Sequence, residues 1–167
     1  RACYDESKRL GEALCWIYGT QLGVPVSVVR PFNNFGPFLD PDDGRLPSDL
    51  ASDALAGRHL SLYSDGSPTR TFSYVSDAAT GYLSALLQES YDVYNNGRDD
   101  DEMTVRDFAE LFSIQSERVL GFRPDVIAEL ENDDSQYLRD NPQRRCPDVS
   151  RARALLQFQP QVSVAEG

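Results

Sequence analysis

The sequence predicts an α/β fold, and three observations support this prediction. Segments with helical and strand-like patterns alternate along the chain, which is typical of mixed α/β domains. A chain of 167 residues fits one domain and is long enough to bury a sizeable core. Hydrophobic residues make up 40% and charged residues 26%, close to ordinary globular usage, so a disordered chain is not expected.

The first predicted helix extends from residue 5 to about residue 21. Apolar residues recur on it at helical spacing: Leu10, Ala13, Leu14, Ile17 and Tyr18. Gly23 and Pro25 then supply a stop signal. The β-branched run at residues 26–29 follows directly and predicts a buried strand of a parallel sheet.

Residues 33–44 are rich in Asn, Gly, Pro and Asp and show no periodicity, so they predict a long loop after that strand. Loops at the carboxyl ends of parallel strands often bind ligands. A second helix is predicted at residues 46–55. Short strands are then predicted at residues 60–63 and 71–75, on either side of a turn at 64–68.

The second half of the chain continues the alternation. Ser76 and Asp77 are predicted to cap a third helix, residues 78–87, and a strand is predicted at 93–95. The acidic run at 99–102 is interpreted as a solvated helix entry, and Thr104 as the cap of the fourth helix. The remaining expectations are a strand near residue 126, an irregular polar stretch at 132–147 and a short helix at 149–156.

The charge balance excludes some classes of partner. The chain carries 27 acidic and 16 basic residues, a net charge of -11, which repels nucleic acid and anionic membranes. A small anionic ligand is still compatible with this charge, because a few converging arginines act at short range. The sequence contains no long apolar run and no signal-peptide pattern, so we expect a cytoplasmic protein without a membrane segment.

No metal site is expected. Cys3, Cys15 and Cys146 are widely spaced, and His59, the single histidine, gives no zinc pattern with them. Residues 40–44 resemble the start of a calcium loop, but the ligand register is not kept, so a turn is predicted there.

Tyr4 and Lys8 stand four residues apart at the start of the first helix, so they share one helix face. A neighbouring ammonium stabilises a phenolate, so Lys8 would make Tyr4 a better proton acceptor for an alcohol. A Tyr-x-x-x-Lys pair also arises by chance on solvated helix faces, and the spacing does not decide between the two readings.

Four sequence blocks together favour the functional reading of the Tyr4–Lys8 pair. They are residues 1–9, RACYDESKR; residues 30–37, RPFNNFGP, followed by DGR at 43–45; residues 66–77, GSPTRTFSYVSD; and residues 145–148, RCPD. In this order the blocks resemble those of the NAD-dependent epimerase/dehydratase family of extended short-chain dehydrogenases/reductases. The similarity is greatest to UDP-glucuronate decarboxylases, also called UDP-xylose synthases.

The resemblance implies the C-terminal part of an NAD(P)-binding Rossmann fold with a small substrate-binding subdomain. Residues 1–35 and about 70–98 would belong to the Rossmann side, and about 36–69 and 99–167 to the substrate-binding subdomain. The family's glycine-rich cofactor turn and its catalytic Ser or Thr precede this region and do not occur in the chain, which begins without Met. We therefore expect a piece of a longer enzyme that is inactive by itself.

The resemblance also implies roles for particular residues, with Tyr4 as general base and Lys8 bound to the nicotinamide ribose. The implied catalytic residues are Tyr4, Lys8 and Arg145. The implied NAD contacts are Tyr4, Lys8, Asn34 and Arg45. The implied contacts to the sugar nucleotide are Asn33, Tyr63, Arg70 and Arg145. Among these, Asn33 and Arg70 would hold the diphosphate, and Arg145 would face the sugar as a partner of its carboxylate or as a proton donor.

Residue type alone leaves other readings open for several of these positions. Asn33 could simply shape a turn, and Tyr63 could be a packed aromatic residue. Arg70 could pair with a surface carboxylate. Arg144 and Arg145 could be a solvated charge pair.

The activity implied for the whole enzyme is NAD-dependent decarboxylation of UDP-glucuronate to UDP-xylose through a 4-keto intermediate. Two alternatives stay within the family, 4-epimerisation and 4,6-dehydration of a nucleotide sugar. A third is a catalytically silent module that binds a sugar nucleotide or dimerises. Family members usually form homodimers through the Tyr-bearing helix, which would place Leu10, Leu14 and Ile17 at an interface.

Overall fold

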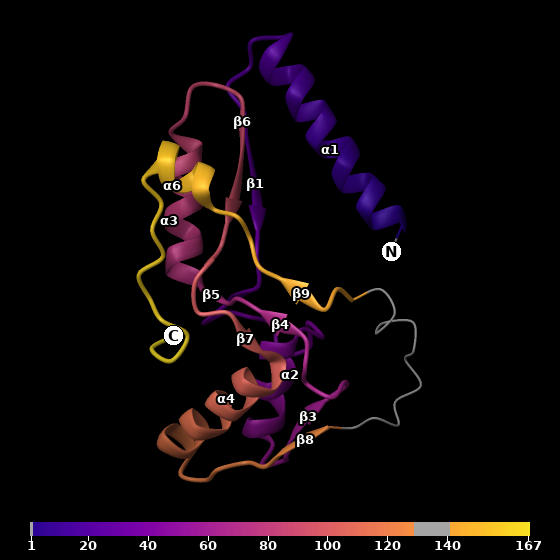
Figure 1. Cartoon of the computed structure of the whole chain (residues 1–167), viewed down its shortest axis with the longest axis vertical. Helices are drawn as coiled ribbons and strands as arrows, with labels where there is room; N and C mark the ends of the chain where they lie inside the picture. Colours follow the sequence, from indigo (N-terminus) through magenta and orange to yellow (C-terminus); the bar gives the residue numbers. More distant parts are fainter. Residues whose placement is uncertain (1, 129–140) are drawn as a thin grey trace.

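The computed structural model describes residues 2–128 and 141–167 (Figure 1). The helices are α1 (Ala2–Thr20), α2 (Leu46–Leu55), α3 (Val75–Leu86), α4 (Val105–Leu120) and α6 (Ser150–Leu156). The strands are β1 (Ser27–Pro31), β2 (Asn34–Phe35), β3 (Leu60–Leu62), β4 (Thr69–Arg70), β5 (Ser73–Tyr74), β6 (Asp92–Asn96), β7 (Met103–Thr104), β8 (Val126–Ala128) and β9 (Arg144–Arg145). Helices and strands alternate, as the sequence predicts.

One end of the molecule is built on the parallel pair β1 and β6, which α3 and α6 cover (Figure 1). Helix α3 lies close to β6 because Gly81 has no side chain: a Cβ there would lie 2.6 Å from the amide nitrogen of Asn96. That amide donates to the carbonyl of Ala78 at 2.8 Å. Tyr94 and Phe158 fill a small core between these elements.

The other end holds the larger core, where α2 and α4 pack with the parallel strands β3 and β8 (Figure 1). Its hydrophobic cluster includes Phe72 and Phe108, whose rings stack with centroids 3.9 Å apart. Helix α4 begins at a capping box formed by Thr104 and Asp107 and ends at Gly121, whose positive φ of 78° favours glycine.

Short strands connect the two ends. Strand β2 pairs with β5, and β4 lies between β7 and β9 in a three-stranded sheet (Figure 1). The pairing of β4 with β9 is parallel and places Arg70 opposite Arg145 and Thr69 opposite Arg144.

The segment after α6 also joins the two ends. Phe158 is buried in the small core, and Val164, 6% exposed, is buried in the larger one. Between them, the backbone N–H groups of Gln161 and Val162 donate to one carboxylate oxygen of Asp77 at 3.0 and 2.9 Å. This segment therefore fastens the two cores to each other through a buried side chain of α3.

Most predicted elements are confirmed. The predicted helices at 5–21, 46–55 and 149–156 correspond to α1, α2 and α6, and Thr104 caps α4. The expected strand near residue 126 is β8. His59 lies exposed before β3, also as predicted.

Other details were wrong. The predicted loop at 33–44 contains β2. Of the predicted strand at 71–75 only residues 73–74 form a strand, β5; β4 lies before it at 69–70, and α3 begins at Val75. Asp77 does not cap α3, because its carboxylate is turned to Gln161 and Val162. Strand β1 is half-buried to exposed, since β6 is the one strand that pairs with it in the described part of the chain.

Two further expectations concern polar segments. The acidic run at 99–102 is not a simple solvated helix entry, because Asp99, Asp100 and Glu102 each form an ion pair with an arginine. The stretch predicted to be irregular, 132–147, contains β9, and its residues 132–140 lie outside the described residues.

The division into a Rossmann side and a substrate-binding side stays a prediction. Helix α6 packs against α3 and β6. A boundary that groups all of residues 99–167 in one unit therefore does not follow the packing of this helix. Within the described residues, none of the helices has the length and apolar character needed to cross a membrane.

Replacing Asp77 with Ala is expected to destabilise the fold by about 1–3 kcal/mol, because two partly buried N–H groups lose their acceptor. Urea denaturation monitored by circular dichroism measures this change. Ser76→Ala is the matched control, since the exposed Ser76 neighbours Asp77 on α3. Equal unfolding midpoints for the two variants would contradict the role given to Asp77.

Candidate functional site

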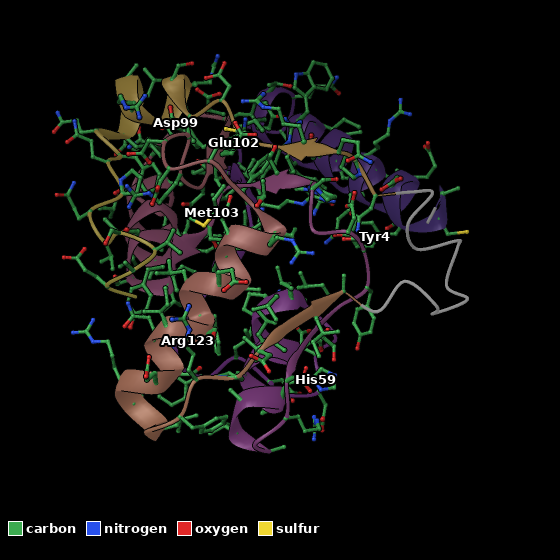
Figure 2. The ribbon with its side chains drawn as sticks, turned by 60° about the horizontal axis from the view of Figure 1, so that its bottom comes forward. Tyr4, His59, Asp99, Glu102, Met103 and Arg123 are labelled. Atoms are coloured by element: carbon green, nitrogen blue, oxygen red, sulfur yellow. The ribbon has the colours of Figure 1, made fainter. Side chains whose placement is uncertain are left out.

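Tyr4 and Lys8 lie on one face of α1, as their spacing predicts. The Lys8 Nζ is 5.4 Å from the centroid of the Tyr4 ring, and Tyr4 is 63% exposed. Figure 1 shows that the end of α1 that carries these residues is directed towards the level of β4 and β9, and Figure 2 labels Tyr4 on this exposed end. Both functional groups are therefore accessible to a ligand in this structure.

Helix α1 is attached to β1 by an ion pair and a close contact. Arg30 donates from Nε and Nη2 to the two carboxylate oxygens of Glu12 at 2.6 and 2.5 Å. These hydrogen bonds hold the pKa of the Glu12 carboxyl below its usual range. Near the other end of the helix, Gly19 lies so close to Tyr91 that a Cβ would be 2.6 Å from its side chain. The attachment fixes the helix that carries Tyr4 against the strand that leads to Asn33.

Asn33 and Asn34 lie where β1 passes into β2. Asn33 has a positive φ of 40° and shapes a turn, and its amide Nδ2 donates to the carbonyl of Thr71 at 2.8 Å. The turn reading of Asn33 is thus correct, and it does not exclude a binding role. Asn34 stands opposite Ser73 in the β2–β5 pair. The Oδ1 of Asn34 and the hydroxyls of Thr71 and Ser73 are buried without a hydrogen-bond partner among the described residues.

Arg70 is buried, with 7% of its surface exposed. Its Nη1 donates to the carbonyls of Thr69 at 2.7 Å and Gln143 at 3.2 Å, and its Nη2 lies 3.5 Å from the Oδ1 of Asn141. Its guanidinium is therefore anchored to both sides of the β4–β9 pair.

Arg145 lies on β9, opposite Arg70 of β4. Strands paired in parallel register present opposite residues on the same face, so the side chains of Arg70 and Arg145 leave the small sheet on the same face. Arg145 is half-buried, and the described part of the chain gives it no ion pair and no side-chain hydrogen bond. This arrangement leaves a cation directed at one face of the small sheet.

Arg144 emerges on the opposite face and is neutralised there. Glu102 accepts hydrogen bonds from Arg144 at 2.8–3.1 Å and from the hydroxyl of Thr69 at 2.6 Å. These bonds lower the pKa of the Glu102 carboxyl. The reading of Arg144 and Arg145 as one solvated charge pair is therefore wrong.

Arg45 and Tyr63 are less closely associated with these groups. Arg45 is exposed and forms an ion pair with Asp43 at 2.9 Å, and Tyr63, 47% exposed, follows β3. The structure thus places Asn33 in the turn before β2, and Arg70 and Arg145 on the paired strands β4 and β9. Their proposed roles, and those of Arg45 and Tyr63, are expectations that the geometry does not test.

Residues that sequence reasoning missed support this cluster. The sequence places Glu102 in a run predicted to be solvated and gives no signal for Gln143. The sequence signal available for Glu102 was its place immediately before a predicted element, together with an excess of arginines near residue 144. Neither signal identifies a partner, because the contacts join segments far apart in the chain.

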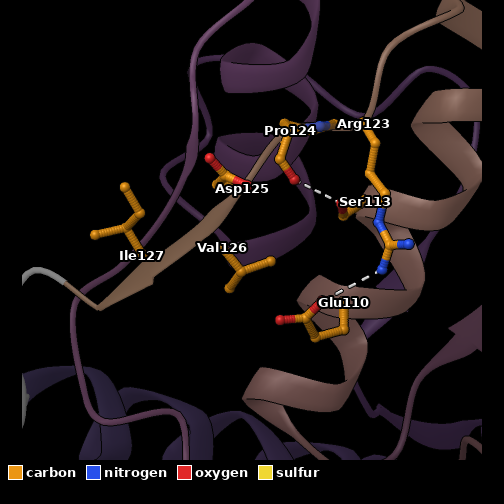
Figure 3. A pocket seen from close by; sticks show the side chains of 7 residues that line it. All are labelled: Glu110, Ser113, Arg123, Pro124, Asp125, Val126 and Ile127. Carbon is orange, nitrogen blue, oxygen red and sulfur yellow. Dashed lines mark hydrogen bonds and ion pairs between the residues drawn. The ribbon is translucent and has the colours of Figure 1, made fainter.

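A cavity elsewhere in the molecule contains none of the predicted site residues. It lies between α4 and β8 and is lined by Glu110, Ser113, Arg123, Pro124, Asp125, Val126 and Ile127 (Figure 3). Arg123 is 3.9 Å from Glu110, and Ser113 donates to the Pro124 carbonyl (Figure 3).

Residues 40–44 form a turn in which Asp43 N–H donates to the Asp40 carbonyl. The described residues hold no cluster of three or more metal-ligating acidic, His or Cys side chains.

Comparison with known proteins places the chain in a family. The sequence pattern described as the NAD dependent epimerase/dehydratase family matches residues 1–97, which include α1, the β1–β2 turn and β6. The chain belongs to this family. The resemblance drawn from the four sequence blocks is confirmed at that level.

Curated relatives match the whole chain. It is 38% identical over 169 residues to UDP-glucuronic acid decarboxylase 1 of Danio rerio, which covers all of this chain and 37% of that protein. It is 36% identical over 168 residues to UDP-glucuronic acid decarboxylase 6 of Arabidopsis thaliana, of which it covers 46%. The chain thus spans less than half the length of these relatives.

Solved structures of the family share the fold. UDP-glucuronic acid 4-epimerase from Bacillus cereus in complex with NAD superimposes with a TM-score of 0.76 at 27% identity, over 98% of this chain and 48% of that one. dTDP-glucose 4,6-dehydratase from Bacillus anthracis gives 0.75 at 22% identity, over 98% of this chain and 49% of that one, a likeness of fold alone. The α/β prediction with Rossmann-type elements is confirmed.

Glu12→Gln is expected to loosen α1 from β1, because Arg30 loses its charged partner. Since the folded-state pKa of Glu12 is lowered, the ion pair stabilises the attachment at neutral pH. That contribution is lost as the pH falls below the unfolded-state value of about 4.3 towards the folded one. Fluorescence of Trp16, the single tryptophan and part of α1, should therefore change as the pH falls below about 4.3 in the wild type and much less in the variant.

Glu6→Gln serves as the control for this measurement, because Glu6 forms an exposed ion pair with Arg9 within α1. Its pH profile should match that of the wild type. A profile of Glu12→Gln that coincides with both would show that the Arg30 pair does not attach the helix.

Proposed function

We propose that the protein carrying this chain is an NAD-dependent decarboxylase that converts UDP-glucuronate to UDP-xylose through a 4-keto intermediate. The observation that carries the proposal is the side-by-side placement of Arg70 and Arg145, with Arg145 lacking an ion pair within the described residues. A sugar nucleotide that also bears a carboxylate has an anionic group for each arginine: the diphosphate for Arg70 and the carboxylate for Arg145. The relatives named as UDP-glucuronic acid decarboxylases support the same reading.

In this proposal the diphosphate binds near Arg70 and Asn33. Arg70 is already held by backbone carbonyls, so little side-chain entropy is lost when it meets a phosphate. Planar guanidinium groups suit phosphate and carboxylate oxygens through paired hydrogen bonds. Arg145 then binds the sugar carboxylate, the group that distinguishes UDP-glucuronate from UDP-glucose. Tyr63, at the end of β3, is assigned to the sugar side.

Tyr4 and Lys8 supply the acid–base chemistry. Tyr4 accepts the proton of the sugar C4 hydroxyl as that carbon is oxidised, and the ammonium of Lys8 on the same helix face stabilises the phenolate. Both side chains are exposed and can reach a ligand laid along α1. The same tyrosine returns the proton when the C4 ketone is reduced again.

The residues present fit the nicotinamide-ribose end of NAD. Lys8 offers donors to ribose hydroxyls, and the buried Oδ1 of Asn34, which has no partner among the described residues, offers an acceptor. Arg45 is exposed and offers a further cation near the same loop. NAD when bound supplies hydride acceptance and return at the sugar C4. The chain contains no Gly-x-x-Gly-x-x-Gly turn for the pyrophosphate.

The carboxylate loss follows from the position of the ketone. Oxidation at C4 places a carbonyl β to the C6 carboxylate in the sugar, and β-keto acids lose carbon dioxide readily. In the proposal Arg145 orients the carboxylate before this step and stands near C5 when a proton must be returned there. Its assignment as a catalytic residue rests on this contact.

A second candidate is 4-epimerisation of UDP-glucuronate, and the fold similarity to the Bacillus cereus UDP-glucuronic acid 4-epimerase favours it over 4,6-dehydration. Tyr4 and Lys8 serve either reaction. The two differ in the fate of the carboxylate, which an epimerase retains. Release of carbon dioxide therefore separates them.

A third candidate is a module that binds the sugar nucleotide without turning it over. The apolar residues Leu10, Leu14 and Ile17 on α1 are 37–61% exposed and suit the homodimer interface expected from the family. Three further expectations are part of the proposed function as a whole: homodimer formation, a cytoplasmic location, and the division into Rossmann and substrate-binding parts.

The test is calorimetric titration with UDP, UDP-glucose and UDP-glucuronate, followed by a carbon dioxide release assay on the native protein that contains this chain. UDP-glucuronate should bind about tenfold or more tightly than UDP-glucose, because a charge-assisted hydrogen bond contributes about 1.5–3 kcal/mol. Arg145→Ala should remove this preference while leaving UDP binding within about twofold.

Tyr4→Phe should abolish carbon dioxide release without weakening UDP-glucuronate binding, since the phenol ring is kept and the proton acceptor is lost. Arg118→Ala is the control for Arg145→Ala and should keep the UDP-glucuronate preference, because the exposed Arg118 lies near the end of α4 and donates to Gln115. Equal affinities for UDP-glucose and UDP-glucuronate in the wild type would overturn the decarboxylase proposal.

A further inference from the structure

Glu102 links all three strands of the small sheet that carries the two arginines. It directly precedes β7, on one side of β4. Its carboxylate accepts from the hydroxyl of Thr69 on β4 at 2.6 Å. It also accepts from Nε and Nη2 of Arg144 on β9, at 2.8–3.1 Å. One side chain therefore reaches from β7 across the central strand to the far strand.

Among the described residues, β9 is attached to β4 by a two-residue ladder, by one backbone hydrogen bond just before it, and by Arg70 Nη1, which donates to the Gln143 carbonyl at 3.2 Å. It is two residues long, and the backbone bond that leads into it runs from the N–H of Thr69 to the carbonyl of Gln143 at 2.8 Å. Short outer strands of this kind open easily, because few hydrogen bonds must break together. The contact of Glu102 with Arg144 adds a charged tie at this point.

The ion pair between Glu102 and Arg144 also affects Arg145, because side chains alternate between the two faces of a strand. Successive residues of a strand point to opposite faces, so Arg144 and Arg145 are directed apart. Glu102 binds the first and leaves the second without an ion pair in the described part of the chain. Holding Arg144 on one face thus fixes Arg145 on the other, beside Arg70.

We propose that Glu102 is a positioning residue that holds β9 against β4 and thereby fixes Arg145 for the carboxylate of an anionic sugar nucleotide. The ligand part of this inference rests on the function proposed above. The structural part, that Glu102 holds β9, does not, so the two can be tested separately. Glu102 itself contacts no substrate in this view, because it lies on the opposite face of the sheet.

The first measurement needs no ligand. Glu102→Gln keeps the size of the side chain and removes its charge, and Asp99→Asn is the matched control. Asp99 accepts a comparable bidentate pair from Arg153 at 2.8 and 3.1 Å, and the two acidic side chains are equally exposed at 26%. Amide hydrogen exchange of Thr69 should be about tenfold faster in Glu102→Gln and unchanged in Asp99→Asn.

The second measurement uses calorimetric titration with UDP-glucuronate and UDP. Glu102→Gln should weaken UDP-glucuronate binding about tenfold and UDP binding less than about twofold, because Arg70 remains on the central strand. A general loss of structure would instead weaken both ligands alike. The double variant Glu102→Arg with Arg144→Glu restores the ion pair in reverse and should recover most of the UDP-glucuronate affinity.

The outcomes separate the two hypotheses. Unchanged Thr69 exchange in Glu102→Gln overturns the positioning role, whatever the ligand data show. Faster exchange in a protein that does not prefer UDP-glucuronate supports the hold on β9 and overturns the proposed function. Faster exchange with an undiminished preference for UDP-glucuronate contradicts the link from Glu102 to Arg145, as does a reversed ion pair that binds no better than the single variant.

Discussion

The parallel pairing of β4 with β9 brings together two arginines that lie far apart in the sequence, and the candidate site depends on it. The register places Arg70 opposite Arg145 and, on the other face, Thr69 opposite Arg144. A shift of one residue would exchange the faces and turn Arg144 towards Arg70. The anion binding proposed for the site therefore depends on strand register as much as on residue type.

A protein with a net charge of -11 can still offer a cationic site, and the ion pairs show how. Arg30, Arg98, Arg144 and Arg153 each meet a carboxylate, which removes them as competing anion sites. Arg145 has no such partner in the described part of the chain. The acidic surface acts at long range and is screened by salt, whereas a guanidinium in contact with a phosphate or carboxylate acts at hydrogen-bond distance.

The connections between the two cores set the geometry around this site. The segment after α6 buries Phe158 in one core and Val164 in the other, and Asp77 and Arg98 bind its backbone between them. Strands β2, β4 and β5 lie in the same region between the cores (Figure 1). Residues that touch no ligand thus determine how Asn33 and Arg70 lie relative to each other.

Local patterns in the sequence were sufficient for most elements. The helical repeat of α1, the boundaries of α2, the Thr104 cap and the short helix α6 were predictable because each depends on neighbouring residues. Strands of two residues were not, because so short a strand has no periodicity of its own and exists through its partner. Strands β2, β4, β7 and β9 are of this kind.

The sequence by itself determined the α/β alternation, the Tyr4–Lys8 face of α1 and the family to which the chain belongs, since these are properties of spacing and of contiguous motifs. Tertiary structure decided which charges are neutralised. Glu102 and Asp77 both looked like parts of helix starts, yet one binds Arg144 and the other the backbone of Gln161 and Val162. Their partners are brought within reach by folding, and no local pattern records a contact between distant segments.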